Sequence, residues 1–430
     1  MLQFIKILLT GIITDCYLFP LDLNLMGFAT NTKMLMAAVG IALFAYDSRG
    51  NKMLVVPKEF LAVSLLAIAV SVLSYFTMVI HHTSDSSLVT YCISFWVWIS
   101  AAYTLFRTIQ QTHGEITVEL IAKYMIAVAT SQCILAYAMT LWPWLHAFID
   151  SFQVDMANFL KDTPGRLYGL SCALDSAGLR FAAILIIITF LSFNLGENKT
   201  AGMIVYTVAF IIITIIGNMI ARSTLIGIIW SVALSFIFIF RQGKNLHLNF
   251  AKLSALIGLL ALVVGGVYIL YHMSPSFRQS MRFGFEGFFS LAETGEWNVR
   301  SNDMLMNMVV WPETLSTWIF GDGYLNSPNA DPNFLGPIIG GFYMGTDIGY
   351  LRYIFYFGLP GLLLMITIFM SIAYICIKKL DSRYTVLFFF LLLSNFTGWL
   401  KVSTDILVIF APFFVLALEQ DRMKPKLLQK

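Results

Sequence analysis

The chain has 430 residues, of which 58% are hydrophobic and 12% charged, and its 27 Lys and Arg against 24 Asp and Glu give a net charge of +3. Soluble domains average about 45–50% apolar and about 25% charged residues, so this composition excludes a soluble enzyme and a disordered chain. The small net charge also excludes a basic surface for binding nucleic acid. The class that remains is a polytopic membrane protein.

Apolar runs bounded by polar clusters follow one another along the whole chain. Nearly all are apolar on every side and too long for strands, which predicts helices. A span needs roughly 20 residues, so we predict an all-α fold, a single transmembrane helical bundle of about 12 spans over 1–430. The expected spans are 3–19, 33–46, 59–80, 88–109, 117–141, 174–193, 200–217, 223–240, 253–271, 348–376, 384–400 and 402–418.

The distribution of Lys and Arg predicts the orientation, because cytoplasmic loops are enriched in these residues. With a cytoplasmic N-terminus, most basic residues fall on short cytoplasmic loops and on the C-terminal tail. Both termini are therefore expected in the cytoplasm, and the two long segments, 143–172 and 272–346, are expected outside. Long segments of this kind are usually functional.

The segment 272–346 shows internal order. Ser274-Pro275 is typical of a helix start, and the apolar residues that follow at helical spacing predict one amphipathic helix able to lie on a membrane surface. A second helix is expected over about 302–312. Gly321-Asp322-Gly323-Tyr324 indicates a turn, and 326–341, rich in Pro, Gly and Asn, indicates a mobile loop over the site.

Several kinds of chemistry have no motif in this sequence. There is no GxxxxGK[ST] phosphate loop, which argues against ATP hydrolysis, and no Asp-x-Asp pair of the kind that holds a divalent cation for a nucleotide-sugar. The five Cys form no CxxC pair. We therefore expect no metal and no cofactor.

Arginines are concentrated at the predicted outer face. An Arg fork binds phosphate with two parallel hydrogen bonds and stays charged, so several of them around one aqueous cavity would form an anion site suited to a lipid diphosphate. The alternative is that each is a snorkelling anchor at the interface, which fits Arg278 and Arg282 on the surface helix best. The outer arginines are Arg166, Arg180, Arg222, Arg278, Arg282, Arg300 and Arg352.

Four outer carboxylates are candidates for a base that activates an acceptor hydroxyl: Asp175, Asp303, Asp322 and Asp347. Asp347 lies where the long segment returns to the membrane. It is interpreted either as a base or as a carboxylate that stabilises the start of the following helix. Asp322 is equally typical of a plain turn.

Four stretches together resemble the O-antigen polymerase family (Wzy-type), within the O-antigen ligase and polymerase superfamily. They are GRLYGLSCALDSAGLRFAA, GNMIARSTLIGIIWSV, RSNDMLMNMVVWPETLSTWIFGDGY and GTDIGYLRYIFYFGLPGLLL. Each motif is degenerate, and their order and spacing carry the resemblance. It implies a fold like that of the lipid-sugar-using (GT-C-like) glycosyltransferases, in the bacterial inner membrane with the large loops in the periplasm.

The resemblance also implies an activity: joining undecaprenyl-diphosphate-linked oligosaccharide repeat units into a polysaccharide. Arg166, Arg222 and Arg300 match the motif arginines and Asp347 the motif Asp. We predict Asp347, Arg222 and Arg300 as catalytic residues, and as substrate-binding residues Arg166, Arg180, Arg352 and Tyr350.

Two other activities stay open, an O-antigen ligase and a flippase or transporter of lipid-linked oligosaccharide. The chain lacks a His after His272, whereas related ligases place one in the late outer loop, which favours the polymerase. Membrane lipids are expected partners, and chain length is set either by this chain or by a regulator protein.

Overall fold

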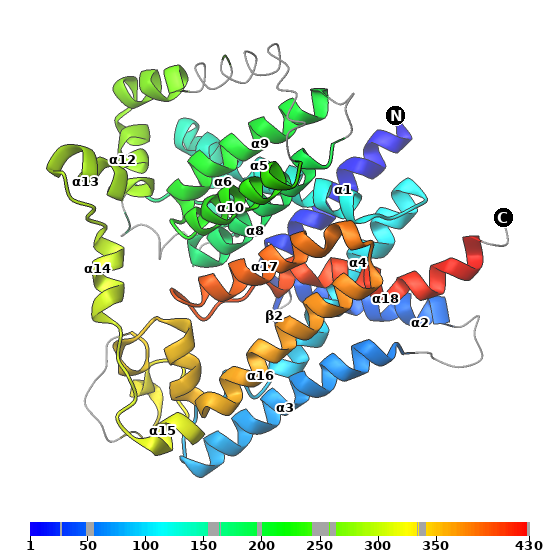
Figure 1. The fold of residues 1–430 in the computed structure, drawn as a ribbon, viewed down its shortest axis with the longest axis vertical. Helices are drawn as coiled ribbons and strands as arrows, with labels where there is room; N and C mark the ends of the chain where they lie inside the picture. Colours follow the sequence, from blue (N-terminus) through cyan, green and yellow to red (C-terminus); the bar gives the residue numbers. More distant parts are fainter. Residues whose placement is uncertain are drawn as a thin grey trace. The chain divides into compact units, whose positions relative to one another are not determined.

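The computed structural model in Figure 1 describes residues 1–25, 28–48, 56–153, 163, 165–195, 200–242, 258, 264–332, 334 and 341–427. Its regular structure is helical, apart from a short antiparallel hairpin of β1 (Asp22–Leu25) and β2 (Phe28–Asn31) that the sequence analysis did not predict. Six helices are long and apolar enough to cross a membrane, so the chain is a helical membrane protein. They are α3 (Lys58–Ile80), α4 (Tyr91–His113), α5 (Val118–Leu141), α8 (Leu174–Phe193), α9 (Thr200–Ile220) and α16 (Gly349–Lys379).

Six is half of the predicted number of spans. The other predicted runs do form helices where the structure describes them, but their apolar parts are short. Helices α1 and α2 have 17 residues each, which at 1.5 Å per residue is about 26 Å and less than the thickness of the hydrocarbon core. The predicted span 253–271 lies partly outside the described residues. The helices of these runs are α1 (Leu2–Leu18), α2 (Thr32–Ser48), α10 (Thr224–Gln242), α17 (Thr385–Gly398) and α18 (Leu407–Leu427), whose apolar part ends at Gln420.

The chain forms two compact units, whereas the sequence analysis predicts one transmembrane domain without a boundary. Unit 1 combines the two ends of the chain, residues 1–128 and 300–430, and unit 2 is the middle, residues 129–299. The change from one unit to the other falls inside α5, between Val128 and Ala129. An apolar run that continues through the boundary explains why composition does not mark it.

Unit 2 is built around α8. Residues 177–191 of this helix are buried, apart from Arg180, since α9 and α10 pack against it, as the green helices in Figure 1 show. Helix α10 approaches very closely at Gly227, where a Cβ atom would lie 2.3 Å from the Ala182 Cα. Small residues at a crossing of this kind allow two backbones to touch, which is how apolar helices associate in membranes.

Unit 1 contains an antiparallel pair of long helices, α3 and α16, which lie side by side in Figure 1. An ion pair between Lys379 Nζ and Glu59 Oε1, 2.7 Å apart, joins the last turn of α16 to the first turn of α3. A second pair close to this end of α16 joins Arg383 to Glu119 at 2.8 Å. The first contact fixes the register of the two helices against each other.

Helix α16 is broken after its second turn. Phe357 and Gly358 have non-helical backbone angles, with φ +73° and ψ −175° at Gly358. Pro360 has no N–H to donate to the Tyr356 carbonyl, which would be its partner in a continuous helix. Gly323 N–H takes that place at 3.1 Å, and Asp322 N–H binds the Phe355 carbonyl at 2.6 Å. The loop after α15 (Leu315–Phe320) therefore completes the hydrogen bonding of the break.

The predicted amphipathic helix of the long segment forms two helices instead of one. Helix α12 (Pro275–Gly284) begins as predicted, with the Ser274 hydroxyl accepting a hydrogen bond from Phe277 N–H at 3.2 Å. It ends at Gly284, which lies against the Asn218 backbone, and α13 (Glu286–Thr294) follows after Phe285. The single-helix prediction is wrong because helical periodicity continues through this turn although the backbone does not.

The second predicted helix of this segment, over 302–312, is shorter than expected. Helix α14 covers Arg300–Asn307 only. Val309 and Val310 follow its end, and β-branched residues lose side-chain freedom in a helix. Pro312 restricts the residue before it to extended conformations. Two 3₁₀-helices, η2 (Pro328–Ala330) and η3 (Tyr343–Gly345), follow α15 in this segment.

The break in α16 predicts a sharp effect of Gly358→Ala. A Cβ at Gly358 would lie 2.3 Å from the Ile319 carbonyl oxygen, and the positive φ disfavours any L side chain. We expect a cost of about 3 kcal/mol and a lower melting temperature in detergent. The control is Gly11→Ala in α1, where a Cβ meets nothing within 4 Å and helix propensity improves. Equal melting temperatures for the two variants would contradict the role of the break.

Candidate functional site

Two of the predicted arginines meet in unit 2. Arg166 lies in the loop before α8, and Arg222 lies in the link between α9 and α10. Their guanidinium carbons are 5.2 Å and 4.5 Å from the centre of the Phe283 ring, at the end of α12. Cations are attracted to the face of an aromatic ring, so Phe283 attracts both guanidinium groups although their like charges repel each other. We call Arg166, Arg222 and Phe283 the arginine cluster.

The two arginines differ in how they are held. Arg222 Nε donates to the Phe283 carbonyl at 2.9 Å, and its Nη1 lies 2.7 Å from Glu286 Oε2 on α13. Arg166 Nε is buried and has no hydrogen-bond partner among the described residues. The loop that carries Arg166 is tied to the end of α9, because Leu167 N–H donates to the Met219 carbonyl at 3.0 Å.

Burial and repulsion both act on these charges. Burial lowers the pKa of Arg166 first, Arg222 lowers it further, and Asp175 opposes both effects. Burial also lowers the pKa of Arg222, while Glu286 and Asp175 raise it. Arg remains protonated in proteins, so two arginines and two carboxylates make the cluster formally neutral.

Arg180, the third predicted arginine of unit 2, lies in the second turn of α8 and is partly exposed. The other predicted site residues, Arg300, Asp347, Tyr350 and Arg352, belong to unit 1. Arg300 is exposed at the first position of α14. The predicted site residues are thus divided between the two units.

Arg352 is buried and holds a loop of its own unit. Its Nε and Nη2 donate to the Leu325 carbonyl at 3.3 Å and 3.2 Å, and Nη2 also donates to Asn326 Oδ1 at 3.1 Å. Its Nη1 lies 3.4 Å from Asp347 Oδ1, and its guanidinium stacks on the Phe342 ring at 3.8 Å. These contacts suit a residue that positions Asp347 and the loop.

Tyr350 is held by the neighbouring helix α17. Its hydroxyl donates to the Phe396 carbonyl at 2.9 Å, and its ring packs edge-on against Trp399 with the centroids 5.8 Å apart. Asp347 itself precedes the helix and its side chain is 28% exposed, so solvent reaches it. Of the four predicted residues in unit 1, Asp347 and Arg352 are brought together.

Two carboxylates that the sequence analysis missed connect the loop after α3 with the loop after α15. Asp85 Oδ2 accepts from Leu325 N–H at 2.8 Å and from Asn326 N–H at 3.0 Å. In return, Asp331 Oδ2 accepts from Ser84 N–H at 2.6 Å and from the Tyr324 hydroxyl at 3.0 Å. Each loop thus supplies a carboxylate to backbone amides of the other, and we call this pair the aspartate clamp.

Asp322 lies beside the clamp and is a more basic carboxylate than an ordinary Asp. It accepts from the Thr317 hydroxyl at 2.7 Å and from the Tyr343 hydroxyl at 3.3 Å. Burial raises its pKa, and the two hydroxyls and His81 oppose the rise. The sequence analysis gave Asp322 as a candidate base or a turn residue, and in the structure it lies half-buried in the loop after α15.

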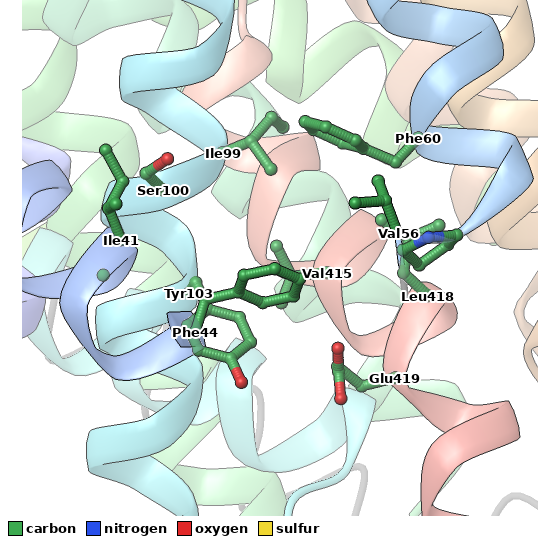
Figure 2. Close-up of a pocket in the computed structure, with 12 residues that line it drawn as sticks. Ile41, Phe44, Val56, Phe60, Ile99, Ser100, Tyr103, Val415, Leu418 and Glu419 are labelled. Atoms are coloured by element: carbon green, nitrogen blue, oxygen red, sulfur yellow. The ribbon is translucent and has the colours of Figure 1, made fainter. Parts of the chain in front are cut away.

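A cavity of about 170 Å³ lies elsewhere in unit 1, between α2, α4, α18 and the start of α3. Figure 2 shows that aliphatic and aromatic side chains form most of its wall, with Ser100, Tyr103 and Glu419 as polar exceptions. The Tyr103 hydroxyl donates to Asp47 Oδ2 at 2.8 Å. None of the residues predicted as site residues lines this cavity.

The aspartate clamp predicts that Asp85→Ala loosens residues 323–331. Two backbone amides would lose a charged acceptor, and hydrogen bonds to charged groups contribute about 1.5–3 kcal/mol each. Hydrogen exchange followed by mass spectrometry should become faster in this segment. The matched control is Asp303→Ala on the exposed face of α14, which should leave exchange at 323–331 unchanged. Unchanged exchange in Asp85→Ala would show that the clamp does not hold the loop.

Asp322 predicts a pH dependence of stability. The pKa of Asp322 is raised in the folded chain. Between the ordinary Asp range and the raised value, the native state therefore binds more protons than the unfolded state. The contribution of Asp322 to stability decreases as pH rises through this window. Asp322→Asn should remove this contribution. The difference in melting temperature between the original chain and the variant should therefore shift in favour of the variant from acid to neutral pH. A difference that is constant with pH would contradict the prediction.

Comparison with known proteins gives no relative for this chain. No protein-family model matches it, and neither a curated protein nor a solved structure does. The resemblance noted in the sequence motifs stays a prediction, and the arginine cluster and the Asp347–Arg352 pair are the structural observations on which a function can be based.

Proposed function

We propose that the chain is a membrane glycosyltransferase that polymerises oligosaccharide repeat units carried on undecaprenyl diphosphate. The observation that carries this proposal is the arginine cluster, in which two half-buried guanidinium groups meet on one aromatic ring. Paired Arg forks suit a diphosphate, because each donates parallel hydrogen bonds to phosphate oxygens. A lipid diphosphate has its charge at the membrane surface and its tail in the bilayer, which suits a protein of this composition.

The proposed reaction is a displacement at the anomeric carbon of the donor sugar. The acceptor hydroxyl forms the new C–O bond, and the bond to the diphosphate breaks with its electron pair leaving on the diphosphate. Arg166 and Arg222 would stabilise the charge that grows there, an electrostatic contribution that needs no metal. Arg222 would exchange its contact with Glu286 for a phosphate oxygen. The hydroxyl proton would pass to a base.

Asp347 is the base that we propose in unit 1. Arg352 fixes its carboxylate from one side, while its partial exposure leaves it open to a substrate hydroxyl. Arg352 and Tyr350 are then positioning residues, since their contacts are with Leu325, Asn326 and Phe396 of the protein itself. Arg300 and Arg180 stay as proposed contacts to the donor.

The finer features of the fold belong to the same proposal. The six long helices would be completed to about 12 spans by α1, α2, α10, α17, α18 and the apolar helix Val264–Met273, giving a GT-C-like bundle. The protein would lie in the bacterial cytoplasmic membrane with both termini inside and the long segments in the periplasm, where a chain-length regulator protein would be a partner.

The test is Arg222→Ala in cells that lack the original gene. The variant should insert and fold, but the polysaccharide should collapse from a ladder to a single-repeat band, a loss of at least about 100-fold in chain growth if the lost stabilisation matches that of other preorganised donors. Gel analysis of the surface polysaccharide reads this out. Arg282→Ala is the matched control, because Arg282 pairs with Glu293 on the exposed surface.

Three outcomes would contradict the proposal that the chain is a polymerase. A normal ladder from Arg222→Ala would remove the arginine cluster from the reaction. Deletion of the gene with long polymer persisting on the lipid carrier would indicate a ligase. Lipid-linked repeat units accumulating on the cytoplasmic face after deletion would indicate a flippase.

A further inference from the structure

A membrane boundary can be located on the pair of helices α3 and α16. Glu59 and Lys379 are in contact, and Ile80 and Gly358 lie 21 residues further along each helix (80 − 59 and 379 − 358). At 1.5 Å per residue this distance is about 31 Å, the thickness of the hydrocarbon core. The end of α3 and the break in α16 therefore lie at the same level.

Exposure along α16 changes at the same place. Every residue of 349–358 except Tyr350 is buried within unit 1. Beyond the break, large apolar side chains become exposed, with Leu359, Leu363, Met370 and Tyr374 among them. A helix that faces lipid exposes apolar side chains, so the lipid-facing part of α16 begins at Leu359.

Helix α15 lies at this boundary. The Ile319 carbonyl and Phe320 N–H meet the backbone of Gly358, and Gly321 meets Tyr356 and Phe357. On its other side, α15 exposes large apolar residues: Leu315 is 74% exposed, Phe320 54% and Ile319 41%. Thr317 faces inward and binds Asp322. One face of this short helix is thus fixed to the protein, and the described residues of unit 1 leave the other face exposed.

The chain before α15 continues the apolar surface. Trp311 is 62% exposed and stacks on Trp318, with the ring centroids 6.1 Å apart, and the Trp318 indole N–H donates to the Pro312 carbonyl at 3.1 Å. Between residues 304 and 320 the only charged side chain is Glu313. Trp residues are enriched where a membrane protein meets the headgroups.

We propose that residues 311–320 form a docking surface for the bilayer, with Leu315, Ile319 and Phe320 inserted among the lipid chains next to the break in α16. The lipid-facing surface of α16 continues directly into this segment, and this continuity identifies lipid as the occupant. Because the segment carries no Lys or Arg, it binds through apolar burial and does not need anionic lipid. The surface is independent of the proposed reaction.

The docking surface would keep the neighbouring loops at a fixed depth in the membrane. Asp322 and Gly323, which complete the hydrogen bonding of α16, follow α15 directly. The aspartate clamp then joins Leu325 and Asn326 to the loop after α3. A lipid-anchored α15 therefore places the clamp and Asp347 just outside the hydrocarbon core.

The test uses a fluorescent label at single positions of the full-length protein in phosphatidylcholine vesicles. Cys16 and Cys92, the two cysteines that are not buried, are first changed to Ser. Ile319→Cys is then labelled with an environment-sensitive nitrobenzoxadiazole dye. The positive control is Leu363→Cys on the lipid-facing part of α16, and the aqueous control is Asn329→Cys, which is exposed in η2, between Asn326 and Asp331 of the clamp. The parent without an introduced cysteine measures background labelling.

We expect the dye at position 319 to emit at a shorter wavelength than at position 329 and to be quenched by lipids brominated on their chains, as at position 363. Quenching should stay the same when half of the phosphatidylcholine is replaced by an anionic lipid. Emission and quenching at 319 like those at 329, with normal quenching at 363, would overturn the proposal. A change at 319 that appears only with anionic lipid would also overturn it, since it would show electrostatic binding.

Discussion

The hydrogen bonding at the break in α16 is the constraint on which the functional part of unit 1 depends. A proline in the helix leaves the Tyr356 carbonyl without its regular donor, and a buried carbonyl without a donor costs about 1–3 kcal/mol. The Gly323 amide supplies this donor, and the Asp322 amide binds the neighbouring Phe355 carbonyl. In doing so they fix the loop from which Arg352 takes its acceptors, and through Arg352 the position of Asp347.

The arrangement in unit 2 depends on the compensation of buried charge and not on backbone geometry. Arg166 and Arg222 come from segments far apart in the sequence, and burial opposes the charge of both. The Phe283 ring and the carboxylates of Asp175 and Glu286 compensate for this. In the proposed function, Arg222 would exchange its carboxylate partner Glu286 for a phosphate oxygen.

The sequence predicted the long helices well and the contacts between distant loops poorly. Apolar runs gave 59–80, 174–193 and 348–376, close to the observed α3, α8 and α16, because a long apolar run has few alternatives to a helix in a membrane. Pro360 within such a run was the available signal for the break. Asp85 and Asp331 had no signal beyond turn composition, since their partners lie about 240 residues away in the chain. Arg166 and Arg222 were predicted as residues, but their meeting on Phe283 required the fold.

The ion pair between Arg222 and Glu286 has a consequence for selectivity. A carboxylate attached to the same chain competes with every dissolved anion, and for short tethers the effective concentration of such a group is in the millimolar range. In the proposed function, chloride or a single phosphate present below that range would leave the ion pair of Arg222 with Glu286 in place. An anion that engages both guanidinium groups at once would gain a second contact without a second loss of translational freedom. The tethered carboxylate would then act as a threshold that favours ligands with two linked phosphates over the abundant small anions of the surrounding solution.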